Sequence, residues 1–259
     1  MPPPAADAPC PEQAFNATAL KWHTCAWLLL PVLVFLTGWM HWYAALPLTL
    51  LTAAGLAPRK RKEPQTRDSL PAFPLFTRSS FLALAAFAAL MTLSGWGEWV
   101  NQHPDHIVRN ACLRELVASP WPVIFPDGNM LVYNTGFWLV PALAGKLAGL
   151  DAARMLVVLW GAWGLFLSWL WLCVFSGRRS LLLALLMAAF GSLLNFQCWL
   201  GLDLFRLHYF GTAEQIMCSA NASIPVLLFF IFLASGRMPL YWIPLLFAAT
   251  AFYSPLAAL

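Results

Sequence analysis

Ionisable side chains gather in one polar segment of an otherwise apolar sequence. His103, Asp105 and Arg109 follow closely on an apolar run that ends near Trp96. A carboxylate at the end of such a run can take a proton from an acceptor or help to hold a divalent cation. Asp105 also follows a proline and precedes a helical pattern, and the N-cap of a helix favours aspartate. Both interpretations of Asp105 stay open.

Other candidate residues lie farther along the chain. Asp127 belongs to a Pro-Asp-Gly-Asn sequence, which is typical of a turn and favours a structural over a catalytic role. Lys146 can snorkel from the end of a helix or meet a lipid phosphate. His208, Glu214 and Gln215 lie in a second polar stretch, before a further apolar run. A glutamate at the mouth of a membrane helix is costly, which favours a functional role.

The composition indicates a membrane protein. Of the 259 residues, 61% are hydrophobic and 10% are charged, whereas a soluble domain is about half apolar and about a quarter charged. Apolar runs approach the ~20 residues that a membrane-spanning helix needs. The net charge of +4 lies in short blocks, a topology signal rather than a nucleic-acid footprint. The sequence contains no Walker motif, which argues against an ATP-driven pump.

The apolar runs predict an all-α, polytopic fold of about seven transmembrane helices plus outer-face juxtamembrane helices. We expect spans over residues 24–40, 42–57, 80–96, 153–176, 180–198, 222–235 and 239–255. The basic run from Arg59 to Lys62 should be cytoplasmic. The Leu131–Leu150 segment is predicted to lie at the outer surface, because a full crossing would move Arg178 and Arg179 outside.

These spans divide the chain into four parts. We expect a disordered cytoplasmic tail over 1–22, a transmembrane hairpin over 23–58, a basic cytoplasmic loop over 59–79 and a helical core over 80–259. The core carries a first outer loop over 97–151 and a second over 199–221. The last apolar run has no closing polar tail, so we expect the sequence to be part of a longer protein.

The order of motifs in the first outer loop carries a resemblance. Asp105 opens a helix that contains Arg109 and a Leu-Arg-Glu-Leu turn, followed by Pro-Trp-Pro-Val over 120–123. Leu-Val-Tyr over 131–133, Gly-Lys-Leu-Ala-Gly over 145–149 and Ala-Ala-Arg-Met over 152–155 come next. This order resembles the amino-terminal half of the GT-C superfamily of membrane glycosyltransferases, in its aminoarabinose transferase and protein O-mannosyltransferase branch. The resemblance covers roughly residues 95–173.

The resemblance implies transfer of a sugar from a polyprenyl-phosphate donor to an acceptor on the outer face of the membrane. Compact loops and the lack of a targeting segment suggest a bacterial inner membrane, with the active face periplasmic. Asp105 matches the acidic residue that acts as a base or supports a metal, and Asp127 falls where some members carry a metal ligand. A divalent metal ion is therefore a possible cofactor. Substrate and phosphate contacts would come from Arg109, Arg114, Tyr133, Lys146, His208, Glu214 and Gln215.

The sequence departs from the family pattern at two points. It has a single Asp105-His106 where many members carry paired acids, and it has an extra hairpin before the usual first span. The alternative functions are a non-enzymatic transporter and a subunit of a membrane complex. A transporter predicts repeat symmetry between the two halves of the chain, and none is visible in the sequence.

Overall fold

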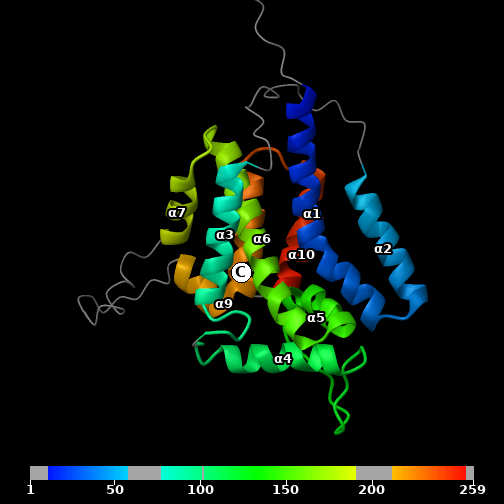
Figure 1. Ribbon diagram of the computed structural model, residues 1–259. Helices are drawn as coiled ribbons and strands as arrows, with labels where there is room; N and C mark the ends of the chain where they lie inside the picture. Colours follow the sequence, from blue (N-terminus) through cyan, green and yellow to red (C-terminus); the bar gives the residue numbers. More distant parts are fainter. Residues whose placement is uncertain (1–10, 58–76, 101, 191–211, 255–259) are drawn as a thin grey trace, which may run out of the picture.

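The computed structural model describes residues 11–57, 77–100, 102–190 and 212–254 (Figure 1). Within these ranges the chain is helical, with a single isolated bridge between Ile124 and Met130, which confirms the all-α class. The helices are α1 (Pro11–Trp39), α2 (Trp42–Leu56), α3 (Arg78–Leu93), α4 (His106–Ala118), α5 (Gly136–Ala148), α6 (Leu150–Ser176), α7 (Leu181–Ala189), α9 (Thr212–Ala234), η1 (Leu240–Trp242) and α10 (Ile243–Tyr253).

Helix α6 is the centre of the bundle. It packs against α1, α3, α5 and α9, and most of its second half is buried. Small residues let the neighbouring helices approach closely, as at Gly164, where an added Cβ would lie 2.6 Å from Ile224 Cγ2 and 2.7 Å from Trp27 Cζ2. Close approach at small residues is a common way for helices to associate in membranes.

Aromatic side chains join the first described helix to the last. The Trp27 indole lies between two rings, with centroids 5.2 Å from Trp160 and 5.0 Å from Tyr253. Its Nε1 donates to the Trp160 carbonyl at 3.0 Å, and the Tyr253 hydroxyl donates to the Trp27 carbonyl. The buried polar atoms of Trp27 and Tyr253 thus have hydrogen-bond partners, as such groups usually do, whereas the Trp160 indole nitrogen is buried without one among the described residues.

Three described helices are long and apolar enough to cross a membrane. They cover Thr18–Trp39, Leu150–Ser176 and Gln215–Ala234. Four further apolar segments, Trp42–Leu56, Arg78–Leu93, Gly136–Ala148 and Leu240–Tyr253, have 10–17 residues. At 1.5 Å per residue such segments fall short of the ~30 Å hydrocarbon layer. By helix length, the part of the chain that the structure describes therefore does not reach the expected seven full spans.

Two helices begin earlier than the sequence suggested. Helix α1 starts at Pro11, inside the tail expected to be disordered over 1–22, and proline suits the first position of a helix. Helix α9 starts at Thr212, inside the second outer loop expected over 199–221. The remainder of that loop, most of the basic loop and the second half of the 180–198 span lie outside the described residues.

Helix α5 occupies most of the segment predicted to be juxtamembrane. Its 13 residues are too few to span a membrane. One face of α5 packs against α1, α4 and α6, where Phe137, Trp138, Leu139 and Ala142 are buried, whereas Leu143 and Leu147 are exposed. Helix α4 crosses the end of the bundle next to α5, at a large angle to α3 and α6 (Figure 1).

Candidate functional site

Helix α4 carries the candidate site at one end of the bundle. Its buried residues, His106, Arg109, Cys112, Leu113 and Leu116, recur every three or four positions and form one face. This confirms the helix predicted after Asp105. Because one face is held against the bundle, the residues at the start of α4 have fixed positions relative to α9.

Asp105 occupies the N-cap position but does not use its side chain to cap the helix. The carboxylate makes no capping hydrogen bond, and 52% of the side chain is exposed. One carboxylate oxygen lies 3.5 Å from His103 Nδ1 and 3.9 Å from Arg109 Nη2. The carboxylate is therefore accessible and keeps capacity to accept further hydrogen bonds.

Arg109 is a buried cation with unused donors. Its side chain is 9% exposed, and its Nη2 donates to the Ser219 hydroxyl at 3.4 Å. The guanidinium carbon lies 5.8 Å from the centre of the Trp96 ring. Its Nε and Nη1 are buried without a hydrogen-bond partner among the described residues. Arg109 is one of the residues expected to contact substrate. Its unpartnered N–H groups are the kind of donor that binds an oxyanion.

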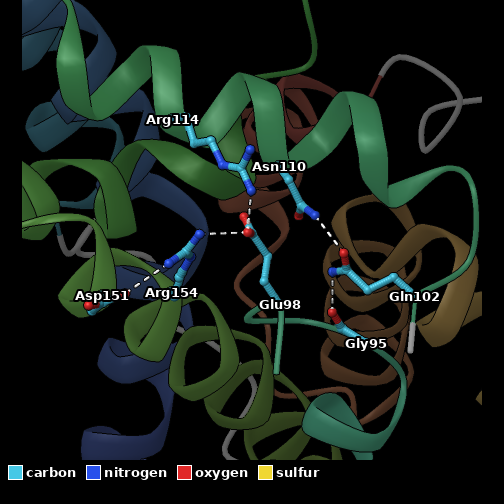
Figure 2. A network of polar contacts seen from close by, with 7 residues as sticks. All are labelled: Gly95, Glu98, Gln102, Asn110, Arg114, Asp151 and Arg154. Atoms are coloured by element: carbon cyan, nitrogen blue, oxygen red, sulfur yellow. Dashed lines mark hydrogen bonds and ion pairs between the residues drawn. The ribbon is translucent and has the colours of Figure 1, made fainter. Parts of the chain in front are cut away.

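A second polar network joins the α3–α4 loop to α4 and α6 (Figure 2). One Glu98 carboxylate oxygen accepts hydrogen bonds from Arg114 Nη2 and from Arg154 Nη2, the latter at 2.6 Å. Arg154 also donates to Asp151 at 2.9 Å. Burial opposes ionisation of the Glu98 carboxyl, but the two guanidinium groups outweigh it and hold its pKa below the ordinary value.

The backbone at Glu98 is strained. Its φ of 66° lies in the left-handed region, which costs about 1–2 kcal/mol for a residue with a side chain. Gly95 and Gly97 have φ values of 91° and 90°, so the chain turns sharply here. Gln102 Nε2 donates to the Gly95 carbonyl at 2.6 Å, and Asn110 Nδ2 donates to Gln102 at 2.7 Å. These bonds hold Glu98 beneath α4, as Figure 2 shows.

Two cations expected to neutralise phosphate have other partners. Arg114 pairs with Glu98. Lys146 donates to the Ser119 carbonyl at 2.5 Å, and its ammonium lies 5.0 Å from the centre of the Trp121 ring. Burial lowers the pKa of Lys146. Lys146 therefore binds backbone carbonyl groups at the C-terminal end of α4, which is a favourable position for a cation.

The contacts described for the remaining candidates do not include Asp105. Asp127 accepts from its own turn, with Asn129 N at 3.1 Å and Asn129 Nδ2 at 2.7 Å, and these hydrogen bonds lower its pKa. The partly exposed Tyr133 ring lies 5.6 Å from Trp138. Gln215 is half-buried in the first turns of α9. Glu214 lies in the same helix, and His208 lies outside the described residues.

Asp105 and Asp127, the two carboxylates expected to support a metal, do not share a position in the described residues. Asp105 and Asp127 have different partners, and a guanidinium is one of the nearest groups to Asp105. Within the described ranges, no group of three or more His, Cys, Asp or Glu residues is placed to hold a metal ion. We therefore assign no step of the proposed reaction to a metal ion.

A break in α9, which was not predicted from the sequence, meets this site. Ser219 has non-helical angles, φ −153° and ψ 46°. Just before it, the carbonyl of Ile216 accepts from Trp96 Nε1 at 2.8 Å and that of Met217 accepts from His106 Nε2 at 2.9 Å. Burial lowers the pKa of His106, more than the carbonyl contact raises it. The neutral imidazole with its proton on Nε2 fits this hydrogen bond.

A signal for Glu98 was present in the sequence. It is a carboxylate between Gly97 and Trp99, immediately after an apolar run, where a sharp turn with a buried acid can be anticipated. No comparable signal marks Ser219, since the nearest proline, Pro225, lies six residues farther on.

No protein-family model matches the chain, and comparisons with curated proteins and with solved structures find no similar protein.

Proposed function

We propose that this protein is an integral membrane glycosyltransferase that moves a sugar from a polyprenyl-phosphate donor to an acceptor, with Asp105 as the general base. One observation carries the proposal. Asp105 stands at the start of a helix, yet its carboxylate is half-exposed and takes no part in capping. An accessible carboxylate on the anchored start of a helix suits a base better than a structural cap.

The three long apolar helices support the membrane part of the proposal. Exposed apolar side chains on the outer helices, among them Phe81, Leu82, Leu182 and Leu185, suit contact with lipid. Helix α4 lies across one end of this bundle, where a lipid-linked donor would present its head group. Following the bias of basic runs to the cytoplasmic side, we place α4 on the periplasmic side of a bacterial inner membrane.

The proposed reaction needs a base and a cation in proximity. Asp105 takes the proton from a hydroxyl or amine of the acceptor, whose oxygen or nitrogen forms the new bond to the anomeric carbon. The bond from that carbon to the phosphate oxygen breaks, and the polyprenyl phosphate leaves with the electron pair. Arg109 lies one helical turn from Asp105, with two nitrogens unpartnered among the described residues, and would stabilise the leaving phosphate.

Glu98 supports the site without touching the reactants in this scheme. By accepting from Arg114 of α4 and Arg154 of α6, it fixes the angle at which α4 crosses the bundle. A shift of about 1 Å in a catalytic group can cost about 10²-fold in rate. We therefore assign Glu98 a positioning role.

The test is sugar transfer by the full-length protein in vesicles. We expect Asp105→Asn to lose at least ~10²-fold in turnover, as loss of a general base should cost. The matched control is Glu115→Gln on the same helix, whose carboxylate contacts Ser119 at 3.2 Å, and it should keep wild-type turnover. An Asp105→Asn variant as active as an active wild type would refute the assignment of the base.

A subunit of a membrane complex is the second candidate, and one observation favours it. Helix α2 packs mainly on α1 and η1, and its residues Trp42, Leu46, Leu50 and Leu51 are exposed. Contiguous apolar surface of this kind contacts either lipid or another protein. A photoreactive residue at position 51 separates the two: a protein adduct of defined mass favours the subunit, whereas lipid adducts alone count against it.

A further inference from the structure

The charged side chains divide between the two ends of the bundle. Every acid whose side chain the structure describes lies toward the end that carries α4, and these acids are Glu98, Asp105, Glu115, Asp127 and Asp151. The other end is where α6 and α9 terminate (Figure 1). There the described Lys, Arg, Asp and Glu side chains are all basic, and they are Lys21, Arg78, Arg178, Arg179 and Arg237.

Two of these arginines, Arg178 and Arg179, follow directly on α6. The first residue after the helix, Gly177, has a φ of 66°, a left-handed angle that turns the chain. The turn is held against α6, because Trp169 Nε1 donates to the Ser180 carbonyl at 3.0 Å. The Arg178 side chain is exposed at this turn.

A third arginine joins them from the start of α3. The Arg179 guanidinium donates to the Ser80 hydroxyl in the first turn of α3, and it lies 5.6 Å from the centre of the Trp169 ring. Ser80 follows two residues after Arg78, which is the exposed first residue of α3. We call Arg78, Arg178 and Arg179 the arginine corner. Arg179 anchors the corner, and Arg78 and Arg178 are its exposed members.

Exposed apolar side chains border the arginine corner. Phe81 and Leu82 follow Arg78 by three and four residues, a spacing that puts them on the same side of α3, and both are exposed. Phe175, three residues before Arg178, is also exposed. Arginine stems cover apolar surface of this kind while the guanidinium stays at the polar boundary.

No carboxylate neutralises the two exposed arginines within the part of the chain that the structure describes. The ion pairs found there lie at the α4 end, and none of them includes Arg78 or Arg178. The sequence that leads into Arg78, residues 58–76, contains five basic residues and two acidic ones, so it is basic as well. The corner therefore complements an anion that also brings apolar surface.

We propose that the arginine corner binds the head group of an anionic phospholipid, whose acyl chains lie along α3 and α7. Helix α7 begins beside the corner with exposed Leu181, Leu182 and Leu185. Helix α6 is long and apolar enough to cross a membrane and ends at Ser176, so the corner lies where such a span reaches the head groups. Basic residues between the ends of membrane helices recognise anionic lipids in this way.

The apolar border favours a lipid over a free phosphate, because only a lipid also covers the exposed side chains of α3 and α7. Two guanidinium groups can each offer paired donors to phosphate oxygens. The inference involves neither Asp105 nor the transfer of sugar. It therefore stands or falls independently of the proposed reaction.

The experiment measures lipid binding to the full chain in detergent by native mass spectrometry. The probes are dioleoyl phosphatidylglycerol, the zwitterionic dioleoyl phosphatidylcholine, and glycerol phosphate, which has no acyl chains. The test variant combines Arg78→Gln with Arg178→Gln, two exposed positions whose loss leaves the Arg179 contacts in place. A second variant, Arg78→Lys with Arg178→Lys, keeps both charges. The matched control combines Lys21→Gln with Arg237→Gln, which removes two charges from the same end but outside the corner.

We expect the wild type to bind phosphatidylglycerol at least about tenfold more tightly than phosphatidylcholine, since each basic residue near an anionic lipid contributes roughly fivefold in affinity. For the same reason the glutamine pair should bind phosphatidylglycerol at least about tenfold more weakly than the wild type, with phosphatidylcholine binding unchanged. The lysine pair and the control pair should both stay within about threefold of the wild type.

Three results would overturn the proposal. The first is a wild type without preference for phosphatidylglycerol, and the second is a glutamine pair that binds this lipid as the wild type does. The third is an equal loss in the glutamine pair and the control pair, which would show a diffuse field in place of a site. Binding of glycerol phosphate as tight as that of the lipid would refute the lipid as the ligand.

Discussion

Replacing Glu98 with glutamine should destabilise the fold by about 2 kcal/mol. Arg154 and Glu98 are largely buried, with 23% and 12% of their side chains exposed, and a hydrogen bond between charged groups contributes about 1.5–3 kcal/mol. The Arg114 side chain is half-exposed, so its pair with Glu98 adds only about 0.2–1 kcal/mol. Both arginines donate to the same oxygen, so the glutamine amide oxygen can still accept from them, but without the negative charge it recovers only about 1 kcal/mol.

The assay is thermal unfolding of the full chain in detergent, followed by tryptophan fluorescence. For a chain of about this size, a loss of 2 kcal/mol lowers Tm by about 4–8 °C. The control is Asp151→Asn, which removes an exposed carboxylate from the same arginine and should change Tm much less. A Glu98→Gln protein that melts with the wild type at pH 7 would refute this account of the network.

The pH dependence provides a second measurement. The folded-state pKa of Glu98 lies below its ordinary value of 4.5, so its stabilising contribution is complete above that value. It is lost as the pH falls through the folded-state pKa. The difference in Tm between the wild type and Glu98→Gln should therefore shrink in that acidic range. A difference that stays constant down to the acid unfolding of both proteins would contradict the electrostatic explanation.

Three other predictions follow from contacts described above. Trp96→Phe leaves the buried Ile216 carbonyl without its donor and should lose about 1–3 kcal/mol of stability, measured as a fall in Tm; an unchanged Tm contradicts this bond. Gly164→Val should disrupt the packing of α6 on Trp27 and cost at least 1–3 kcal/mol, so a wild-type elution profile and Tm would refute that contact. The lowered pKa of His106 means that stability should fall as the pH drops below 6.5, and His106→Gln should flatten this slope in a Tm–pH series.

Elements with strong local signals could be predicted from the sequence. Helix α6 begins at Leu150, three residues before the expected span, and α2 ends at Leu56, one residue before the expected end. Helix α4 begins directly after Asp105, where a proline and an acidic residue marked its start. In each case an apolar run or a Pro-Asp pair within the segment marks the boundary, although the Asp105 side chain itself makes no capping hydrogen bond.

Features that depend on tertiary contact could not be predicted. Glu98 meets Arg114 and Arg154 across 16 and 56 residues, and no spacing rule connects positions that far apart on different helices. The break at Ser219 occurs without a proline or glycine at that position. Its freed carbonyls bond to Trp96 and His106, which come from another part of the chain. The full site therefore depends on side-chain hydrogen bonds from α4 and the α3–α4 loop to α9.

The contact between Trp27 and Tyr253 has a consequence for the order of biosynthesis. The Tyr253 hydroxyl that bonds the Trp27 carbonyl is made 226 residues later. At roughly 5–20 residues per second, α1 waits about ten to fifty seconds in the membrane before its aromatic partner emerges. Until Tyr253 is made, lipid, the insertion machinery or a helix made before α10, such as α6 with Trp160, must cover the Trp27 face.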